Sequence, residues 1–509
     1  MSVIALLTVA ALSAIILGNL IAQGDILTAY LGLLVVVGLV ALQQLKSSFW
    51  LLLPFAMVSN LPAISIVVAS LTLGELWICA SMGFVGIYWV LERRKVQSVF
   101  SGPGIWMYSY LAWALLILVM NPVGLAFTGA ATGGFRFYLK IILGFIAFFI
   151  IANSRMGELN AKRMTYLLIL GVTAETGFKI VGAFVPQVGF LTASSAGSAG
   201  GGGGGGFYGW QQLLAILPAL IVPFVFARYT VSDLLQPRRW WVAIGVIVLF
   251  LMVLFSGKRS LAVLVILFPG ILLFIRGKVV VAGAYSIAGL AGFLCLLGVH
   301  FSGVALPQNT QRILSVIPGV TGFDHEVTKS AENDFRDTLN RYAILDIRER
   351  PIFGEGFKVD FEALYYLENS PNLVLGVDDH IQGAKYAVSS AWHNTWLGMS
   401  ADFGIPAAII YALLILTYIR KSFRLLRQLD QRSYQWTLVA GLLAIVIGEL
   451  LRSWQFGHAS ITYWQVSWKV GVLFAVENWL RQQAFEKVAA EREGRPNTPE
   501  LSSSFSESR

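Results

Sequence analysis

The sequence predicts an all-α polytopic integral membrane protein with about fourteen transmembrane helices. Hydrophobic residues make up 56% of the 509 residues and charged residues only 13%, which is too little polar surface for a soluble globular protein. Apolar runs long enough to cross a bilayer recur from one end of the chain to the other. Together these observations exclude the soluble class and favour a helical membrane bundle.

The expected spans are placed where each apolar run begins and ends. They cover residues 3–22, 26–43, 49–69, 73–91, 104–120, 136–152, 163–184, 208–227, 239–256, 260–275, 279–300, 394–419, 436–453 and 461–480. The first run lacks the basic segment of a cleavable signal peptide, so we expect it to be a span. The third contains Pro54 and Pro62, so we expect it to be broken or re-entrant.

The basic residues predict the orientation. Clusters of Lys and Arg fall on one side of this arrangement, at residues 92–95, 155–163, 237–240, 276–278 and 420–432. By the positive-inside rule that side is cytoplasmic, and both termini lie there with it. The net charge of +9 then reflects topology, and we expect membrane lipids but no nucleic acid as partners.

The expected organisation has four parts. They are an N-terminal transmembrane bundle of about eleven helices (1–300), a large outer loop (301–393), about three C-terminal transmembrane helices (394–480) and a disordered cytoplasmic tail (481–509). Within the loop, the composition of residues 333–351 predicts a helix that stops at Pro351, followed by a turn over 351–357. The glycine tract at 194–209 lacks the strand–loop–helix context of a phosphate cradle and is predicted to be a linker.

One titratable group stands at the threshold of a predicted span. His393 follows Trp392 and precedes Asn394 directly before an apolar helix, where lipid would reject the ring and a cavity or partner would accept it. The alternative is an interfacial residue that neighbours the helix N-cap. The histidines show no paired metal-binding spacing, although residues 378–380 (DDH) would be the place to look, so we expect neither a metal nor a cofactor.

Cations at the outer side are candidates for binding an anion. Lys258 and Arg259 lie in a short hairpin predicted to face outward, against the orientation signal. Either the topology is locally different there, or these charges serve an anionic ligand, for which guanidinium offers a planar fork of donors. Arg336 and Arg341 lie on the predicted loop helix but are five residues apart, so they do not share a face; the alternative for each is a solvated loop arginine.

One further charged set lies near the outer end of the span at 436–453. Glu449 and Arg452 are three residues apart, and we expect them to pair with each other. Arg452 is also a candidate for substrate binding, since an intramembrane cation marks a functional site by default.

Three segments together carry a resemblance to a known family. They are SGKRSLAV (256–263), FRDTLNRYAILDIRERPIFGEGF (335–357) and AWHNTWLGMSADFGIPAAIIYALLIL (391–416). In this order they resemble the O-antigen ligase and Wzy-type polymerase superfamily, over residues 205–420. Arg259 matches the hairpin arginine of that family, Arg336 its loop arginine, and His393 with Asn394 its closing pair. Asp402 stands where Glu is more usual.

The resemblance implies a GT-C-like glycosyltransferase of the bacterial cytoplasmic membrane, with a periplasmic active site. Its donor would be an undecaprenyl-diphosphate-linked glycan, and its acceptor another glycan, lipid A core or a protein, alongside polysaccharide-assembly proteins as partners. His393, Arg259 and Arg336 would be catalytic, and Lys258, Arg341, Asn394, Trp392 and Arg452 would bind substrate. No metal or cofactor is implied. Arginines at the outer mouth suit a diphosphate leaving group, and an imidazole suits the activation of an acceptor hydroxyl.

Alternatives remain open at this point. An exporter or flippase of lipid-linked glycans would also be polytopic and cationic, but such folds favour charges buried at mid-membrane and internal repeats, and neither is evident in the sequence. A non-enzymatic scaffold is the third reading. Between polymerase and ligase, the loop contains no feature that identifies the acceptor.

Overall fold

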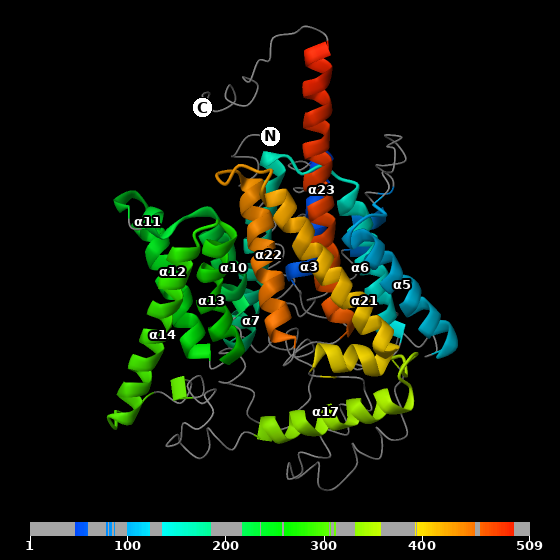
Figure 1. The fold of residues 1–509 in the computed structure, drawn as a ribbon, viewed down its shortest axis with the longest axis horizontal. Helices are drawn as coiled ribbons and strands as arrows, with labels where there is room; N and C mark the ends of the chain where they lie inside the picture. Colours follow the sequence, from blue (N-terminus) through cyan, green and yellow to red (C-terminus); the bar gives the residue numbers. More distant parts are fainter. Residues whose placement is uncertain are drawn as a thin grey trace, which may run out of the picture. The chain divides into compact units, whose positions relative to one another are not determined.

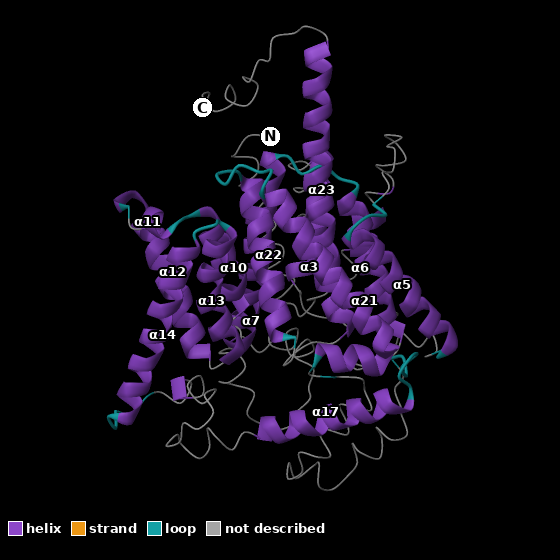
Figure 2. Ribbon diagram, viewed as in Figure 1, coloured by secondary structure: helices purple, strands orange, loops and turns teal. Residues whose placement is uncertain are grey.

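The computed structural model of the chain describes residues 46–59, 99–122, 135–184, 216–234, 236–256, 259–304, 331–357, 392, 394–453 and 459–492, with isolated positions at 78–79, 81–83, 86, 306 and 310–311. Within these residues the regular elements are helices, and no strand occurs (Figure 2). The chain divides into two compact units, Met1–Leu52 and Leu53–Arg509. The first contributes the 3₁₀ helix η1 (Lys46–Leu51) to the described part; the second carries the features below.

Helices follow one another along the chain (Figure 1). They are α3 (Leu52–Ser59), α5 (Pro103–Met120), α6 (Phe135–Ala152), α7 (Glu158–Phe184), α10 (Ile216–Arg228), α11 (Val231–Leu234), η2 (Pro237–Arg239), α12 (Trp240–Ser256), α13 (Arg259–Ile275), α14 (Val279–Phe301), α17 (Ala331–Glu349), α21 (Thr395–Leu426), α22 (Tyr434–Arg452) and α23 (Ala459–Arg492). Among the described helices, four are long and apolar enough to cross a membrane: α5, α14, α21 and α22. The all-helical membrane class is confirmed, while the number of fourteen spans stays a prediction.

Three of the predicted helices coincide closely with observed ones beside a Pro or a charged residue. The spans expected at 239–256 and 260–275 are α12 and α13, with the predicted hairpin between Ser256 and Arg259. The loop helix expected at 333–351 is α17, which ends at Glu349, two residues before Pro351. A proline restricts the residue before it and cannot continue a helix, so the stop was encoded locally.

Helices from the two predicted transmembrane regions pack against each other. Helix α23 lies along α6, and α21 lies along α5. Small residues permit the close approach: a Cβ on Gly471 would come within 3.0 Å of the carbonyl oxygen of Phe148. Close packing through glycine is the usual way for membrane helices to associate. The core of the larger unit is therefore shared between N-terminal and C-terminal helices.

Helix α23 continues to Arg492, past residue 481, where the sequence predicted a disordered tail to begin. Polar pairs one turn apart support this extension. Arg481 Nη2 lies 2.8 Å from Glu477 Oε1, and Gln482 Nε2 donates to Glu486 Oε1 at 2.5 Å. Pairs at this spacing stabilise a helix without any tertiary packing, which composition alone did not reveal.

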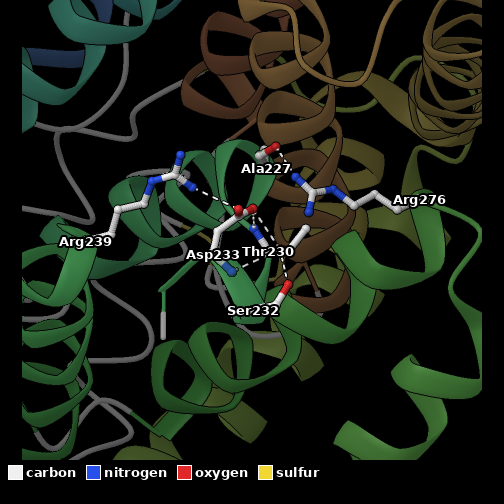
Figure 3. Close-up of polar contacts among 6 residues, drawn as sticks. All are labelled: Ala227, Thr230, Ser232, Asp233, Arg239 and Arg276. Atoms are coloured by element: carbon white, nitrogen blue, oxygen red, sulfur yellow. Dashed lines mark hydrogen bonds and ion pairs between the residues drawn. The ribbon is translucent and has the colours of Figure 1, made fainter. Parts of the chain in front are cut away.

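One end of the bundle, here called the basic end, collects the Lys- and Arg-rich connections (residues 153–158, 228–239, 276–278 and 427–433). Figure 3 shows part of it: Asp233 accepts the backbone N–H of Thr230 at 2.9 Å and pairs with Arg239 at 2.9 Å. Arg276 Nη2 donates to the carbonyl of Ala227 at 2.6 Å. The hydrogen bonds to Thr230, followed by the nearby Arg239, lower the pKa of Asp233.

Stacked cations close the same end. The guanidinium of Arg228 lies 4.1 Å from the centre of the Tyr434 ring, and that of Arg276 lies 5.1 Å from the Trp436 ring. The backbone N–H of Tyr434 donates to Glu158 Oε1 at 2.8 Å. Four connections thus meet at one end of the bundle: those before α7, after α10, after α13 and before α22. The predicted topology places these connections on the same side of the membrane.

Candidate active site

Helix α21 is interrupted at Gly404, whose φ of 77° and ψ of 166° are not helical. Pro406 follows two residues later and has no N–H, so the carbonyl of Asp402 has no donor within the helix. The N–H of Gly356, in the turn after α17, takes that place and donates to Asp402 O at 2.6 Å. The sequence analysis did not predict this break in α21. The Gly–x–Pro sequence at 404–406 is the local signal that could have predicted it.

Two more backbone bonds join the same segments. Glu355 N donates to Ala401 O at 2.9 Å, and Ile405 N donates to Pro351 O at 2.8 Å. In an unbroken helix Ile405 would donate to Ala401 instead. The turn 351–357 therefore replaces the missing helical bonds of residues 401–405, and this paired unit is called the clasp below.

Glycine is required on both sides of the clasp. A Cβ on Gly404 would lie 1.8 Å from the carbonyl oxygen of Ile352, and a Cβ on Gly354 would lie 2.6 Å from that of Ala401. Gly354 and Gly404 also have φ of 62° and 77°, a region that L side chains rarely adopt. The Pro-x-x-Gly-x-Gly pattern and the Asp-Phe-Gly pattern, fifty residues apart in sequence, are thus two halves of one structure.

Aromatic rings anchor the clasp to α5 and α6. Phe357 is fully buried, and its ring centre lies 4.8 Å from Phe403 and 5.0 Å from Tyr138. Phe353 stacks on Trp113 at 5.8 Å, and the indole N–H of Trp113 donates to Phe403 O at 2.7 Å. The clasp is held on the membrane bundle itself, so its geometry is rigid.

Helix α17 and Trp392 pack on the first segment of α21. Leu339 and Ala343 of α17 form a buried cluster with Trp392 and Ala401, and Figure 1 shows α17 beside the start of α21. The indole Nε1 of Trp392 donates to Asp402 Oδ1 at 2.8 Å, and Asp402 is 1% exposed. A carboxylate this deeply buried needs such a donor, because an unbonded charge in an apolar setting is unfavourable by several kcal/mol.

Asn394 caps α21, as the sequence allowed. Its Oδ1 accepts the backbone N–H groups of Trp396 at 3.0 Å and Leu397 at 3.2 Å. Thr395 N donates to Ser453 O at 2.9 Å, and Trp396 Nε1 donates to Ser453 Oγ at 2.7 Å. The N-terminus of α21 is therefore fixed to the C-terminus of α22. We call this end of the bundle the motif end; it comprises the clasp, α17, Trp392, Asn394 and the junction of α21 with α22.

The structure brings some of the predicted residues together and separates others. Trp392 and Asn394 lie at the motif end, both less than 10% exposed. Arg341 lies on an exposed part of α17, away from the buried stripe. Arg452 is the last residue of α22 and is partly buried, next to Ser453 of the α21 junction.

The remaining predicted residues are only partly described. Arg259 is the first residue of α13 and Arg336 lies in α17, but their side chains lie outside the described part. His393 and Lys258 lie outside the described residues altogether. Their roles stay predictions.

Glu449, which the sequence analysis pairs with Arg452, is bound by a lysine of another helix. Lys469 of α23 donates to both carboxylate oxygens of Glu449, at 2.5 and 2.6 Å. Lys469 is 1% exposed and the Glu449 side chain is 36% exposed. A lysine buried in the bundle needs a counter-charge, and Glu449 on the neighbouring helix α22 supplies it.

Acidic groups gather at the corner between α17 and the clasp. Burial, followed by the nearby carboxylates of Glu355 and Glu349, raises the pKa of Asp346 to about 6. Arg350 opposes this rise and lies 3.7 Å from Glu355. Among the described residues no group of three or more His, Cys, Asp or Glu is arranged to hold a metal; residues 378–380 lie outside them.

Comparison with known proteins adds no name to this geometry. No family model matches the chain, and no curated protein matches it significantly. The site therefore has to be interpreted from its own chemistry and from the motif resemblance.

Proposed function

We propose that the protein is a polyprenyl-diphosphate-dependent glycosyltransferase, either a polysaccharide polymerase or an O-antigen ligase. One observation carries the proposal: the clasp joins the turn 351–357 to residues 401–405 by three backbone hydrogen bonds, with Trp392 and Asn394 beside it. The resemblance requires these separate segments to form one site. Their meeting at one end of the bundle supports it.

The distribution of charge supports the side on which the reaction would occur. Tyr434 and Trp436, at the start of α22, lie at the basic end, whereas Ser453 follows the other end of the same helix at the motif end. Since basic connections face the cytoplasm, the motif end would face the periplasm and both termini the cytoplasm. A lipid-linked donor exposes its diphosphate at that interface.

The proposed reaction needs cations and a base. An acceptor hydroxyl oxygen attacks the anomeric carbon, the bond from that carbon to the diphosphate oxygen breaks, and the hydroxyl proton passes to the His393 imidazole. Arg259 and Arg336 would stabilise the negative charge that grows on the departing diphosphate. By helical spacing, position 336 is in register with Leu339 and Ala343, whereas Arg341 is exposed. Helical register therefore favours position 336 over position 341 for the role of the loop arginine.

Purified protein in proteoliposomes, supplied with an undecaprenyl-diphosphate glycan and candidate acceptors, tests the proposal. We expect glycan transfer with release of undecaprenyl diphosphate, and a loss of about 10²–10⁴-fold in His393→Ala. Arg336→Ala should abolish transfer, and Arg348→Ala, a matched change at an exposed arginine of the same helix, should leave it nearly unchanged. Turnover that is absent under all acceptors, or equal in the two arginine variants, would contradict the assignment.

One observation favours an exporter as the second candidate. The ion pair between Lys469 and Glu449 joins two membrane helices, with the lysine fully buried, and buried charges of this kind often mark transport pathways. In the same proteoliposomes, movement of the lipid-linked glycan across the bilayer without bond formation would support export. Product formation without movement would support the transferase.

A further inference from the structure

We infer that Asp402 is a positioning residue, which acts through the Trp392 indole to fix Trp392, the residue before the predicted base, against the clasp. The inference rests on the proposed function, because it assigns Asp402 a role in holding the segment that contains the predicted base. It uses only described contacts. Asp402 itself is not proposed to touch the substrate.

Asp402 is the point where three segments meet. Its side chain accepts from Trp392 Nε1 at 2.8 Å, its carbonyl accepts from Gly356 N at 2.6 Å, and Gly404 follows it at the helix break. Trp392 in turn packs on α17 through Leu339. A change at this carboxylate therefore reaches Trp392 directly and α17 through Trp392, while the backbone bond to the turn remains.

The location is unfavourable for a carboxylate unless it has such a role. Asp402 lies in the last turn before the break at Gly404, and a negative charge at a helix C-terminus opposes the helix dipole. It is also 1% exposed, and burying a charge is unfavourable without a strong partner. A neutral side chain would pack there at lower free energy, so the charge indicates a demand for a short, directional bond to Trp392.

Residues on either side of position 393 are both anchored to the same helical segment. Trp392 is tied to its last turn through Asp402, and Asn394 caps its first turn through Trp396 N and Leu397 N. Gly398 makes room for the indole, since a Cβ there would lie 2.8 Å from Trp392 Cβ. Removing the bond from Asp402 would release one of the two anchors and leave the other.

The molecule contains a matched control. Trp113 also donates its indole N–H to this segment, to Phe403 O at 2.7 Å. Trp113→Phe and Trp392→Phe therefore each remove one indole N–H bond to neighbouring residues of one helix, to a backbone carbonyl in the first case and to a carboxylate in the second. A purely structural role predicts equal effects, whereas positioning predicts that only Trp392→Phe changes the reaction.

Kinetics in proteoliposomes give the first arm of the test. We expect Trp392→Phe to lower kcat about 10–100-fold with little change in donor KM, as for small misplacement of a reacting group, and to alter the pH profile of kcat. Trp113→Phe should stay within about threefold. Asp402→Asn, which keeps an oxygen for the indole, should retain more activity than Asp402→Ala. Equal kcat losses in the two tryptophan variants would overturn the inference.

A second arm does not depend on glycan transfer. The rate at which diethyl pyrocarbonate modifies His393, followed by mass spectrometry of the intact folded protein, should change several-fold in Trp392→Phe and Asp402→Ala but not in Trp113→Phe. His300, on α14, serves as the internal reference. If the wild type transfers no glycan, the modification rate at His393 still tests whether Asp402 positions this segment. An unchanged rate at His393 in Trp392→Phe would reject positioning, and Trp392→Phe covers the case in which Asp402→Ala does not fold, because it removes the same hydrogen bond from the donor side.

Discussion

The motif end and the basic end of the bundle are closed by different kinds of interaction. At the motif end, backbone hydrogen bonds pass between the turn 351–357 and residues 401–405, and Gly404 has almost no room for a side chain. At the basic end, Arg228 and Arg276 stack on aromatic rings, and Arg239 pairs with Asp233 at 38% and 31% exposure. Backbone bonds at positive φ permit one geometry, whereas stacking and exposed ion pairs tolerate many.

This difference teaches where precision is needed. A site that must hold a reacting segment to a fraction of an ångström is best built from backbone contacts and buried rings. An end whose role is orientation in the membrane needs only charge, which several arginines supply interchangeably. We therefore expect substitutions at the motif end to be severe and those at the basic end to be mild.

The largest effect should come from the ion pair of Lys469 with Glu449, beneath the motif end. Glu449→Leu leaves the buried Lys469 ammonium without its ion-pair partner, and breaking a buried pair in this way is unfavourable by about 3–5 kcal/mol. The double variant Lys469→Met/Glu449→Leu should recover most of that loss, because both charges are gone. Thermal unfolding in detergent, at equal protein concentration, measures the stability of the single and the double variant. A double variant as unstable as the single variant would show that the loss comes from packing rather than from the unpaired charge.

Gly404→Ala should follow, with a loss of more than about 2 kcal/mol in the free energy of unfolding. The new Cβ would lie 1.8 Å from Ile352 O at a φ of +77°, so the clasp has to open. Gly245→Ala in α12 is the matched control, since nothing lies within 4 Å of its Cβ, and it should change stability by no more than about 1 kcal/mol. Equal unfolding temperatures for the two variants would mean that the clasp contributes little.

Much of the fold could be predicted from sequence because its signals are local. Helix boundaries follow from apolar runs and prolines, as for α17 before Pro351 and α12 and α13 around the 256–259 hairpin. The N-cap role of Asn394 also follows from residue type and position. Two of the quoted motifs, the turn 351–357 and residues 402–404, are joined in the clasp.

What the sequence concealed is the pairing between distant groups. Pro406 has no N–H to donate to the carbonyl of Asp402, and Gly356 donates to that carbonyl in its place. Gly356 and Asp402 are forty-six residues apart in sequence, so no local pattern predicts this hydrogen bond. The same holds for Glu449, whose carboxylate accepts two hydrogen bonds from Lys469 on another helix. Intramembrane charges are balanced by whichever helix is packed beside them, so the partner is a property of the fold.

The two helix caps give an intermediate test of the comparison. Asn394→Ala removes two bonds at the buried start of α21, and Ser433→Ala removes one, to Trp436 N at 3.1 Å, at the start of α22. Each should lower stability by about 0.5–2 kcal/mol. Only Asn394→Ala, at the motif end, should also reduce glycan transfer at a temperature where both variants are folded. If Asn394→Ala and Ser433→Ala reduce glycan transfer equally, the motif end and the basic end do not differ in function.

The smallest effects concern pH, and they should have opposite sign at the two ends. Burial first, then Glu355 and Glu349, raises the pKa of Asp346 to about 6 from 3.8, so the folded state binds its proton more tightly, and stability falls as pH rises between about 4 and 6. Asp346→Asn should therefore be more stable than wild type at pH 7, by about 1 kcal/mol or less after solvent screening, and this advantage should shrink at pH 4.5.

At the basic end, hydrogen bonds to Thr230, then Arg239, lower the pKa of Asp233 below 3.8. The stability that the Asp233 carboxylate contributes is therefore present above pH 3.8 and is lost only as pH falls through the folded-state pKa. Asp233→Asn should consequently be slightly less stable than wild type at pH 7 and equally so at pH 4.5. Unfolding midpoints at the two pH values separate the cases, because only the Asp346 difference changes between them. An Asp346→Asn variant that is less stable at pH 7 would instead indicate that Arg350 holds this carboxylate in a favourable pair.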